Sequence, residues 1–173
     1  MRGTRFYLWL GMFLVAIPIA AFALVFRSDI AGLFGFAQEG LSLKVDLSER
    51  RMYVREGGKT VKTYNVAVGQ PSHPTPTGHF RTGRIEWNPS WNPPNSPWAR
   101  GKKPRAPGDP ANPMRGVKIY FREPSYYIHG TNDPASIGSA ASHGCIRMTE
   151  SDAVELARRI EAAGGGVPLE IVP

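Results

Sequence analysis

Hydrophobic residues follow two different patterns along the chain. Residues 6–26 form a continuous run without a charged side chain, whereas apolar and polar positions alternate in short stretches from Leu41 onward. A repeat of two residues predicts half-buried β-strands. The strands expected on this basis are 41–46, 52–54, 61–68, 80–85, 117–121, 126–128 and 169–172.

One later segment has helical spacing instead. Ala153, Leu156, Ala157 and Ile160 recur at intervals of three and four residues, as on the buried face of an α-helix. A capping-box-like sequence, 149–152, precedes them, and three consecutive glycines follow at 164–166. The second part of the chain is therefore predicted to be mainly β, with one convincing helix.

The segment 87–116 has no periodicity. It holds eight of the sixteen prolines and three of the four tryptophans. Disordered segments are poor in aromatic residues, so we expect an ordered loop that packs on the domain or on a ligand. A lid or wall is the favoured interpretation, and a plain proline-rich excursion is the alternative.

The first apolar run predicts how the chain is organised. Its 21 residues suffice to cross a hydrocarbon core of ~30 Å as a helix, and the charges of Arg2 and Arg5 place the amino terminus in the cytoplasm. The predicted parts are a cytoplasmic tail (1–5), a transmembrane signal anchor (6–26), a linker (27–40) and an exported domain (41–173). A cleaved signal peptide, which would give a secreted form, is the alternative.

The chain is basic, with a net charge of +7, and its densest basic cluster is 100–105. It contains no nucleic-acid-binding motif, so no nucleic-acid partner is expected. A solvated basic loop explains the cluster simply. Attraction to an anionic polymer such as the bacterial envelope is the functional alternative.

Cys145 is the only cysteine, and it lies in the sequence Ser-His-Gly-Cys-Ile-Arg at 142–147. An exported chain with one cysteine forms no internal disulfide, so the thiol is either a buried structural group or a reagent. The histidines near Cys145 in the sequence favour a reactive thiol, because an imidazole close to the sulfur can take its proton. His143 and His129 are both candidate bases, and spacing alone does not decide between them.

Other residues near Cys145 have plausible roles. Gly144 would let main-chain amides approach an oxyanion, and Arg147 could bind a carboxylate. A zinc site made of Cys145, His129 and His143 is a weaker alternative, because paired ligand spacing is absent. His73 and His79, which lie in or beside a proline-rich loop, are interpreted as surface residues.

Several motifs in the same order resemble those of the L,D-transpeptidase catalytic domain family (YkuD-type). The resemblance extends over about Leu41 to Val172. Its most specific parts are Ile-His-Gly-Thr-Asn at 128–132 and Ser-His-Gly-Cys-Ile-Arg-Met at 142–148. Further matching segments are 45–54, Thr-Pro-Thr-Gly-His-Phe at 75–80, and 107–116, where Arg115 is inserted before the glycine.

The resemblance implies a β-sandwich-like domain with one main helix packed against it. It also implies residue roles. Cys145 would be the nucleophile and His129 the general base, with the Gly130 carbonyl orienting the imidazole ring. The oxyanion and substrate-binding residues would be Ser142, His143, Gly144 and Arg147. No metal or cofactor is expected.

The implied activity is peptidoglycan L,D-transpeptidation. Cys145 would form a thioester with a tetrapeptide stem, and an amine would resolve it, which gives a 3–3 crosslink or attaches an envelope lipoprotein. The alternatives are an L,D-carboxypeptidase with water as acceptor and a non-catalytic wall-binding module. The expected location is the bacterial cytoplasmic membrane, crossed once, with the catalytic domain outside.

Overall fold

The computed structural model describes residues 40–173. The predicted tail (1–5) and transmembrane helix (6–26) lie outside the described residues, as does the linker (27–40) except for Gly40. Within 40–173, no helix has the length and apolar character needed to cross a bilayer.

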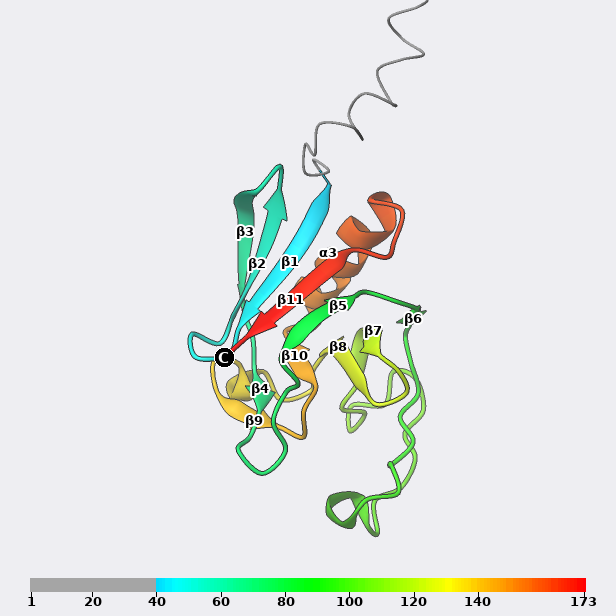
Figure 1. The fold of residues 1–173 in the computed structure, drawn as a ribbon. Coiled ribbons are helices and arrows are strands. Elements are labelled where there is room, and N and C mark those ends of the chain that lie inside the picture. Colours follow the sequence, from blue (N-terminus) through cyan, green and yellow to red (C-terminus); the bar gives the residue numbers. More distant parts are fainter. Residues whose placement is uncertain (1–39) are drawn as a thin grey trace, which may run out of the picture. The chain divides into compact units, whose positions relative to one another are not determined.

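Two main β-sheets build the domain (Figure 1). The first has the order β3-β2-β1-β11-β5, and the second has the order β10-β8-β7-β6. The strands of the first sheet are β1 (Leu41–Asp46), β2 (Arg51–Glu56), β3 (Lys59–Asn65), β5 (Gly78–Arg81) and β11 (Pro168–Val172). Those of the second are β6 (Ile85–Trp87), β7 (Arg115–Arg122), β8 (Tyr126–Gly130) and β10 (Ile146–Met148). A small third sheet pairs β4 (Val68–Gly69) with β9 (Ala140–Ser142), and two 3-10 turns are η1 (Pro97–Ala99) and η2 (Pro134–Ser136).

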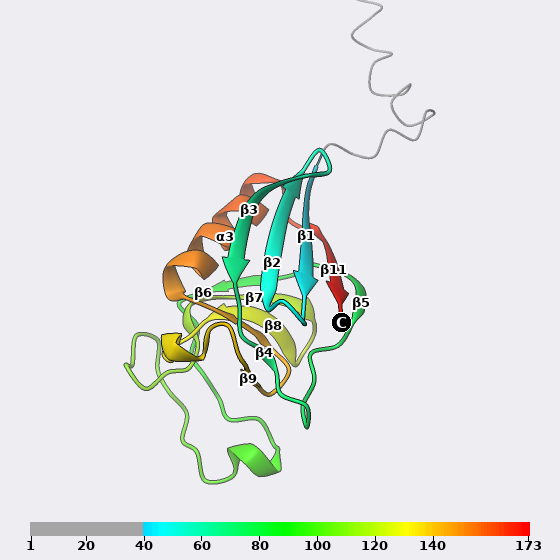
Figure 2. The same cartoon turned by 90° about the vertical axis from the view of Figure 1, so that its left-hand side faces the viewer.

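The only α-helix in this part of the chain, α3 (Glu150–Ala162), packs on β7 and β8. Two ion pairs also link it to the first sheet, Lys62–Glu155 at 3.4 Å and Arg159–Glu56 at 3.8 Å, and Figure 2 shows α3 alongside both sheets. Thr149 caps its first turn, because the Thr149 hydroxyl accepts the Asp152 amide at 3.2 Å. The prediction of a mainly β fold with one helix is confirmed.

A single core lies between these elements. Its fully buried side chains come from all of them: Val45 and Val54 from the first sheet, Ile119 and Ile128 from the second, and Leu156 from α3. All four residues that were expected on the buried face of the helix are fully buried in this core.

Two predicted strands are each divided in the structure. The expected strand 61–68 becomes β3 and β4, because Ala67 leaves the first sheet to pair with Arg147. The expected strand 80–85 becomes β5 and β6, which belong to different sheets. The chain crosses between those sheets at Thr82 and Gly83, whose amides donate to carbonyls of Val167 and Tyr120. No proline and no run of turn-forming residues stands at either crossing, so the sequence pattern does not reveal them.

Candidate active site

The pairing of β8 with β10 brings the two key side chains together. These strands are parallel, with Ile128 opposite Ile146 and His129 opposite Arg147. Since side chains alternate between the faces of a sheet, His129 and Arg147 share one face. Cys145, which immediately precedes β10, opens into the same cavity as both, with a volume of about 1120 Å³.

A tight turn presents Cys145. The Ser142 hydroxyl accepts the Gly144 amide at 3.0 Å and donates to the Cys145 carbonyl. Gly144 has φ +108°, and a Cβ there would lie 2.8 Å from the Tyr126 ring, so any other residue would be strained and crowded. Ser142 and Gly144 therefore hold the turn in shape.

The surroundings of Cys145 favour the neutral thiol. Burial raises the pKa of the thiol to about 11, against lowering by hydrogen bonds from Tyr127 and by the charges of Arg147 and Lys118. The thiol donates to the Ser125 carbonyl at 3.5 Å. Among the described residues no hydrogen bond joins the side chains of Cys145 and His129, so a proton could pass between them only after the thiol turns away from Ser125.

His129 is buried and neutral. Its Nδ1 donates to the Gly130 carbonyl at 2.8 Å, which leaves Nε2 as the proton acceptor. Burial lowers the pKa of His129 to about 4, while the carbonyls of Gly130 and Pro113 act in the opposite direction by favouring the charged ring. A Cβ on Gly130 would lie 2.3 Å from the Arg115 carbonyl oxygen and 3.0 Å from the Glu150 Cα, so only glycine fits between β7 and the start of α3.

His143 has a different environment. Its ring stacks on Trp98, with centroids 4.0 Å apart, and meets the edge of the His73 ring at 4.9 Å. Burial lowers the pKa of His143, and the nearby charges of His73, Arg147 and Lys102 add to this. His73 was expected to be an ordinary surface residue; it is exposed, but its ring also contacts this cluster.

The proline-rich segment forms one wall of the cavity. Trp91 and Trp98 both line it, whereas the exposed Trp87 donates to Glu161 of α3 instead. The main chains of Trp91 and Arg105 exchange two hydrogen bonds, 2.9 and 2.8 Å long. In Figures 1 and 2 the segment extends from β6 toward the end of the domain that carries β4 and β9.

Asn112 fastens the base of this segment. Its side chain is fully buried, and its amide nitrogen donates to the carbonyls of Pro89 and Ala106 at 2.9 and 3.0 Å. Its Oδ1 accepts the Met114 amide at 2.8 Å. Three bonds from one buried side chain thus tie together positions far apart in the segment, which makes it an ordered wall.

The cavity is strongly basic. Five cationic side chains line it, and no aspartate or glutamate is among the lining residues. The cationic residues are Lys102, Lys103, Arg105, Lys118 and Arg147. Such a surface favours ligands with carboxylate groups.

Tyr127 and Lys118 are site residues that the sequence interpretation missed. Tyr127 lies two positions before His129 on β8, and strand alternation would have indicated its place on the same face. The Lys118 ammonium lies 5.3 Å from the centre of the Tyr127 ring. Lys118 comes from β7, so only the pairing of β7 with β8 reveals its position.

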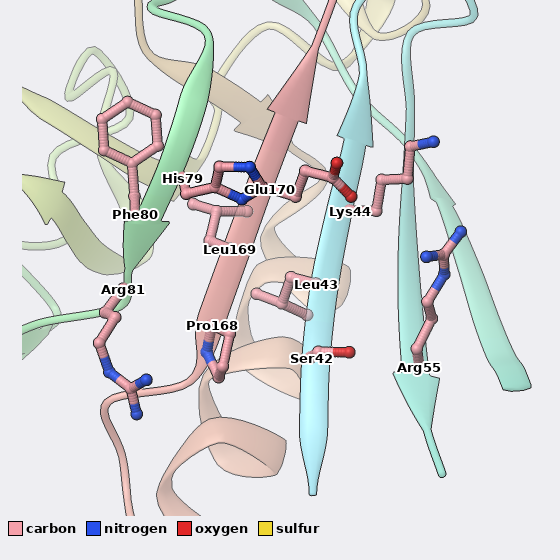
Figure 3. Close-up of a pocket in the computed structure, with 10 residues that line it drawn as sticks. All are labelled: Ser42, Leu43, Lys44, Arg55, His79, Phe80, Arg81, Pro168, Leu169 and Glu170. Carbon is pink, nitrogen blue, oxygen red and sulfur yellow. The ribbon is translucent and has the colours of Figure 1, made fainter. Parts of the chain in front are cut away.

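A second hollow, of about 580 Å³, lies on the first sheet (Figure 3). Its polar side chains, including Lys44, His79 and Glu170, alternate with the buried Leu43 and Leu169, so they belong to the solvent face. His79 is exposed, as expected. None of the residues that line this hollow lines the cavity of Cys145. Within 40–173, no group of three or more His, Cys, Asp or Glu side chains could hold a metal ion.

A mainly β domain that presents a cysteine and a buried histidine in one cavity has the arrangement of enzymes with a thiol nucleophile. The L,D-transpeptidase catalytic domain family (YkuD) matches residues 41–170. The chain belongs to this family, which confirms the resemblance seen in its motifs.

Two relatives illustrate the match. The chain is 34% identical over 115 residues to the Bacillus subtilis (strain 168) protein YkuD, named as an L,D-transpeptidase, over 66% of this chain and 57% of that one. It is also 34% identical over 116 residues to the L,D-transpeptidase ErfK/SrfK of Escherichia coli (strain K12), over 62% of this chain and 37% of that one. The matched part therefore spans less than two thirds of either relative.

Solved structures show the same fold. The L,D-transpeptidase from Mycobacterium smegmatis aligns with a TM-score of 0.59 at 17% identity, over 78% of this chain and 59% of that one. The catalytic domain from the E. faecium L,D-transpeptidase aligns with a TM-score of 0.59 at 23% identity, over 79% of this chain and 99% of that one.

The raised pKa of the thiol predicts how Cys145 reacts with iodoacetamide. Because only the thiolate reacts, the alkylation rate of the full-length protein should rise about tenfold per pH unit from pH 7 to pH 10, well below a pKa of about 11. Stopped alkylation followed by intact-mass measurement gives the rate, and Cys145→Ala, which has no thiol, provides the blank. A plateau in the rate between pH 6 and 8 would contradict the neutral resting state and indicate a preformed thiolate–imidazolium pair.

Proposed function

We propose that this chain is a peptidoglycan L,D-transpeptidase with Cys145 as nucleophile and His129 as general base. The observation that carries the proposal is the placement of both side chains by neighbouring strands in one cavity, in a member of this family. The geometry around His129 supports its role, because Gly130 fixes the ring and leaves Nε2 as acceptor.

In the first half-reaction, the substrate is the L,D peptide bond after the third residue of a tetrapeptide stem. Nε2 of His129 takes the Cys145 proton as the sulfur attacks the carbonyl carbon. The C–N bond then breaks, and the terminal D-alanine leaves with the proton held by His129. The product on the enzyme is a thioester between the Cys145 sulfur and the shortened stem.

In the second half-reaction, an amine attacks the thioester carbonyl and gives a proton to His129. The C–S bond breaks, and the sulfur recovers the proton from the ring. The acceptor we propose is an amine of another stem, which gives a 3–3 crosslink, or of an envelope lipoprotein. The wall formed by residues 87–116 supports an amine over water, because it can exclude solvent from the thioester.

The remaining site residues support the developing charge and the substrate. Ser142, His143 and Gly144 shape the oxyanion site through the turn that they form around Cys145. Arg147 lies on the cavity face beside His129 and binds a substrate carboxylate. The absence of acidic lining residues in the described cavity fits stem peptides, which carry carboxylates.

The apolar run 6–26 supports a location in the bacterial cytoplasmic membrane, crossed once, with the catalytic domain outside. A topology reporter fused after Pro173 is then active only outside the cytoplasm. Activity of the same fusion inside the cytoplasm would refute this location.

Purified disaccharide tetrapeptides test the reaction directly. The full-length protein in detergent should convert them to 3–3 crosslinked dimers with release of D-alanine, and Cys145→Ala should form no product, because no other thiol is present. Mass spectrometry of the muropeptides gives the outcome. Tripeptide monomers as the main product would indicate an L,D-carboxypeptidase, and unchanged substrate would indicate a non-catalytic wall-binding module.

Substitution of the two candidate bases separates their roles. His129→Ala should slow acylation by roughly 10²–10⁴-fold, the usual contribution of a general base, whereas His143→Ala, which removes the partner of Trp98, should have a milder effect. The rate of D-alanine release under single-turnover conditions measures acylation. A mild defect in His129→Ala together with a severe one in His143→Ala would reverse the assignment.

A further inference from the structure

The Cys145 sulfur needs hydrogen-bond donors when it loses its proton, because a buried anion without partners is unfavourable. The surroundings described above offer few. The Gly144 amide already donates to Ser142, and the Ser125 carbonyl can only accept, so it favours the neutral thiol. Tyr127 is the residue placed to supply donors to the sulfur, because its main-chain amide and its hydroxyl both lie near enough to Cys145 to lower the pKa of the thiol.

The backbone fixes this contact. Because Ile128 lies opposite Ile146 in parallel strands, the residues before them, Tyr127 and Cys145, are also neighbours. Tyr127 shares its face with His129, and the rings of the two residues meet edge to face at 5.5 Å. All three side chains open into the same cavity.

Neighbouring groups keep the Tyr127 hydroxyl a donor. Burial raises the pKa of this hydroxyl, and the charge of a Cys145 thiolate raises it further, so the phenol stays protonated. Lys118 lies over the ring and is itself mostly buried, with its side chain 12% exposed and paired to Glu86 at 3.5 Å. A cation at the ring face withdraws electron density, which strengthens the O–H as a donor.

We propose that Tyr127 is a third catalytic residue, whose hydroxyl donates a hydrogen bond to the Cys145 sulfur and stabilises it as the thiolate. When His129 takes the thiol proton, the sulfur leaves the Ser125 carbonyl and is held by the amide and hydroxyl of Tyr127 until it attacks. Tyr127 transfers no proton at any stage. The inference rests on the proposed function only for the effect on acyl transfer, since the state of the thiol can be measured without any peptidoglycan substrate.

Tyr127→Phe removes the hydroxyl and keeps the ring contacts with His129 and Lys118. The matched control is Tyr120→Phe, which removes a hydroxyl from the neighbouring ring, 5.4 Å away, where it is bonded to Glu86 instead of sulfur. Thermal melting and circular dichroism of the full-length proteins confirm that both variants are folded. A purely packing role for Tyr127 predicts no effect of the Phe substitution.

The first readout is the rate at which the thiol reacts with 4,4′-dithiodipyridine at fixed pH values between 7 and 9. A hydrogen bond to a charged group changes an equilibrium by roughly tenfold or more. The thiolate fraction of Tyr127→Phe should therefore fall about tenfold, and the more basic thiolate regains roughly threefold in reactivity, so the net rate should fall about threefold or more. Tyr120→Phe should react like the wild type.

The second readout is D-alanine release from tetrapeptide, which should be slowed at least about tenfold in Tyr127→Phe, mainly in kcat. Wild-type thiol reactivity in a folded Tyr127→Phe protein would overturn the proposal, whatever the peptide assay shows. If the thiol reacts more slowly but neither variant nor wild type releases D-alanine, the Tyr127 contact is supported and the transpeptidase assignment fails.

Discussion

The pairing of β8 with β10 is the constraint on which the candidate site depends. It sets Ile128 against Ile146 in the core and thereby places His129, Cys145 and Arg147 on the face that opens to the cavity. A shift of one residue in this register would exchange the faces of the strand that slips and bury its candidate catalytic side chains among apolar ones. The fully buried isoleucines oppose that shift, because it would move one of them out of the core. Core packing therefore fixes how His129, Cys145 and Arg147 lie relative to one another.

Burial also determines how the thiol works. It raises the pKa of Cys145 and lowers that of His129, so the resting pair is neutral. A neutral thiol is protected from unwanted oxidation, since the thiolate is the reactive form. Proton transfer from Cys145 to His129 would therefore create two charges, and neighbouring groups stabilise each of them. The Gly130 and Pro113 carbonyls favour the imidazolium, while Tyr127, Lys118 and Arg147 favour the thiolate.

The segment 87–116 is anchored to the domain and also borders the cavity that leads to the Cys145 sulfur. Its base is fixed by the three hydrogen bonds of buried Asn112, and Trp98 reaches the turn that carries Cys145 by stacking on His143. His143 thus helps to hold the wall in place. For this reason it is the weaker candidate for the base, although it lies nearer to Cys145 in the sequence. The basic side chains of the same segment give the cavity its charge. Shape and charge of the site come largely from a stretch without regular secondary structure.

The sequence by itself determined the mainly β class, the helix after Thr149 and the pair of motifs that contain His129 and Cys145. Those features depend on local information, namely alternation, helical spacing and residues adjacent in the chain. Only the tertiary structure decided that strands 61–68 and 80–85 divide between sheets, because the chain changes its pairing partner there without a proline or a run of turn residues to mark the change. It also decided that Tyr127 and Lys118 line the cavity of Cys145, since their positions follow from pairing between β7, β8 and the turn before β10. Pairing between distant segments depends on which register buries the most apolar surface, and no single segment of the sequence contains that information.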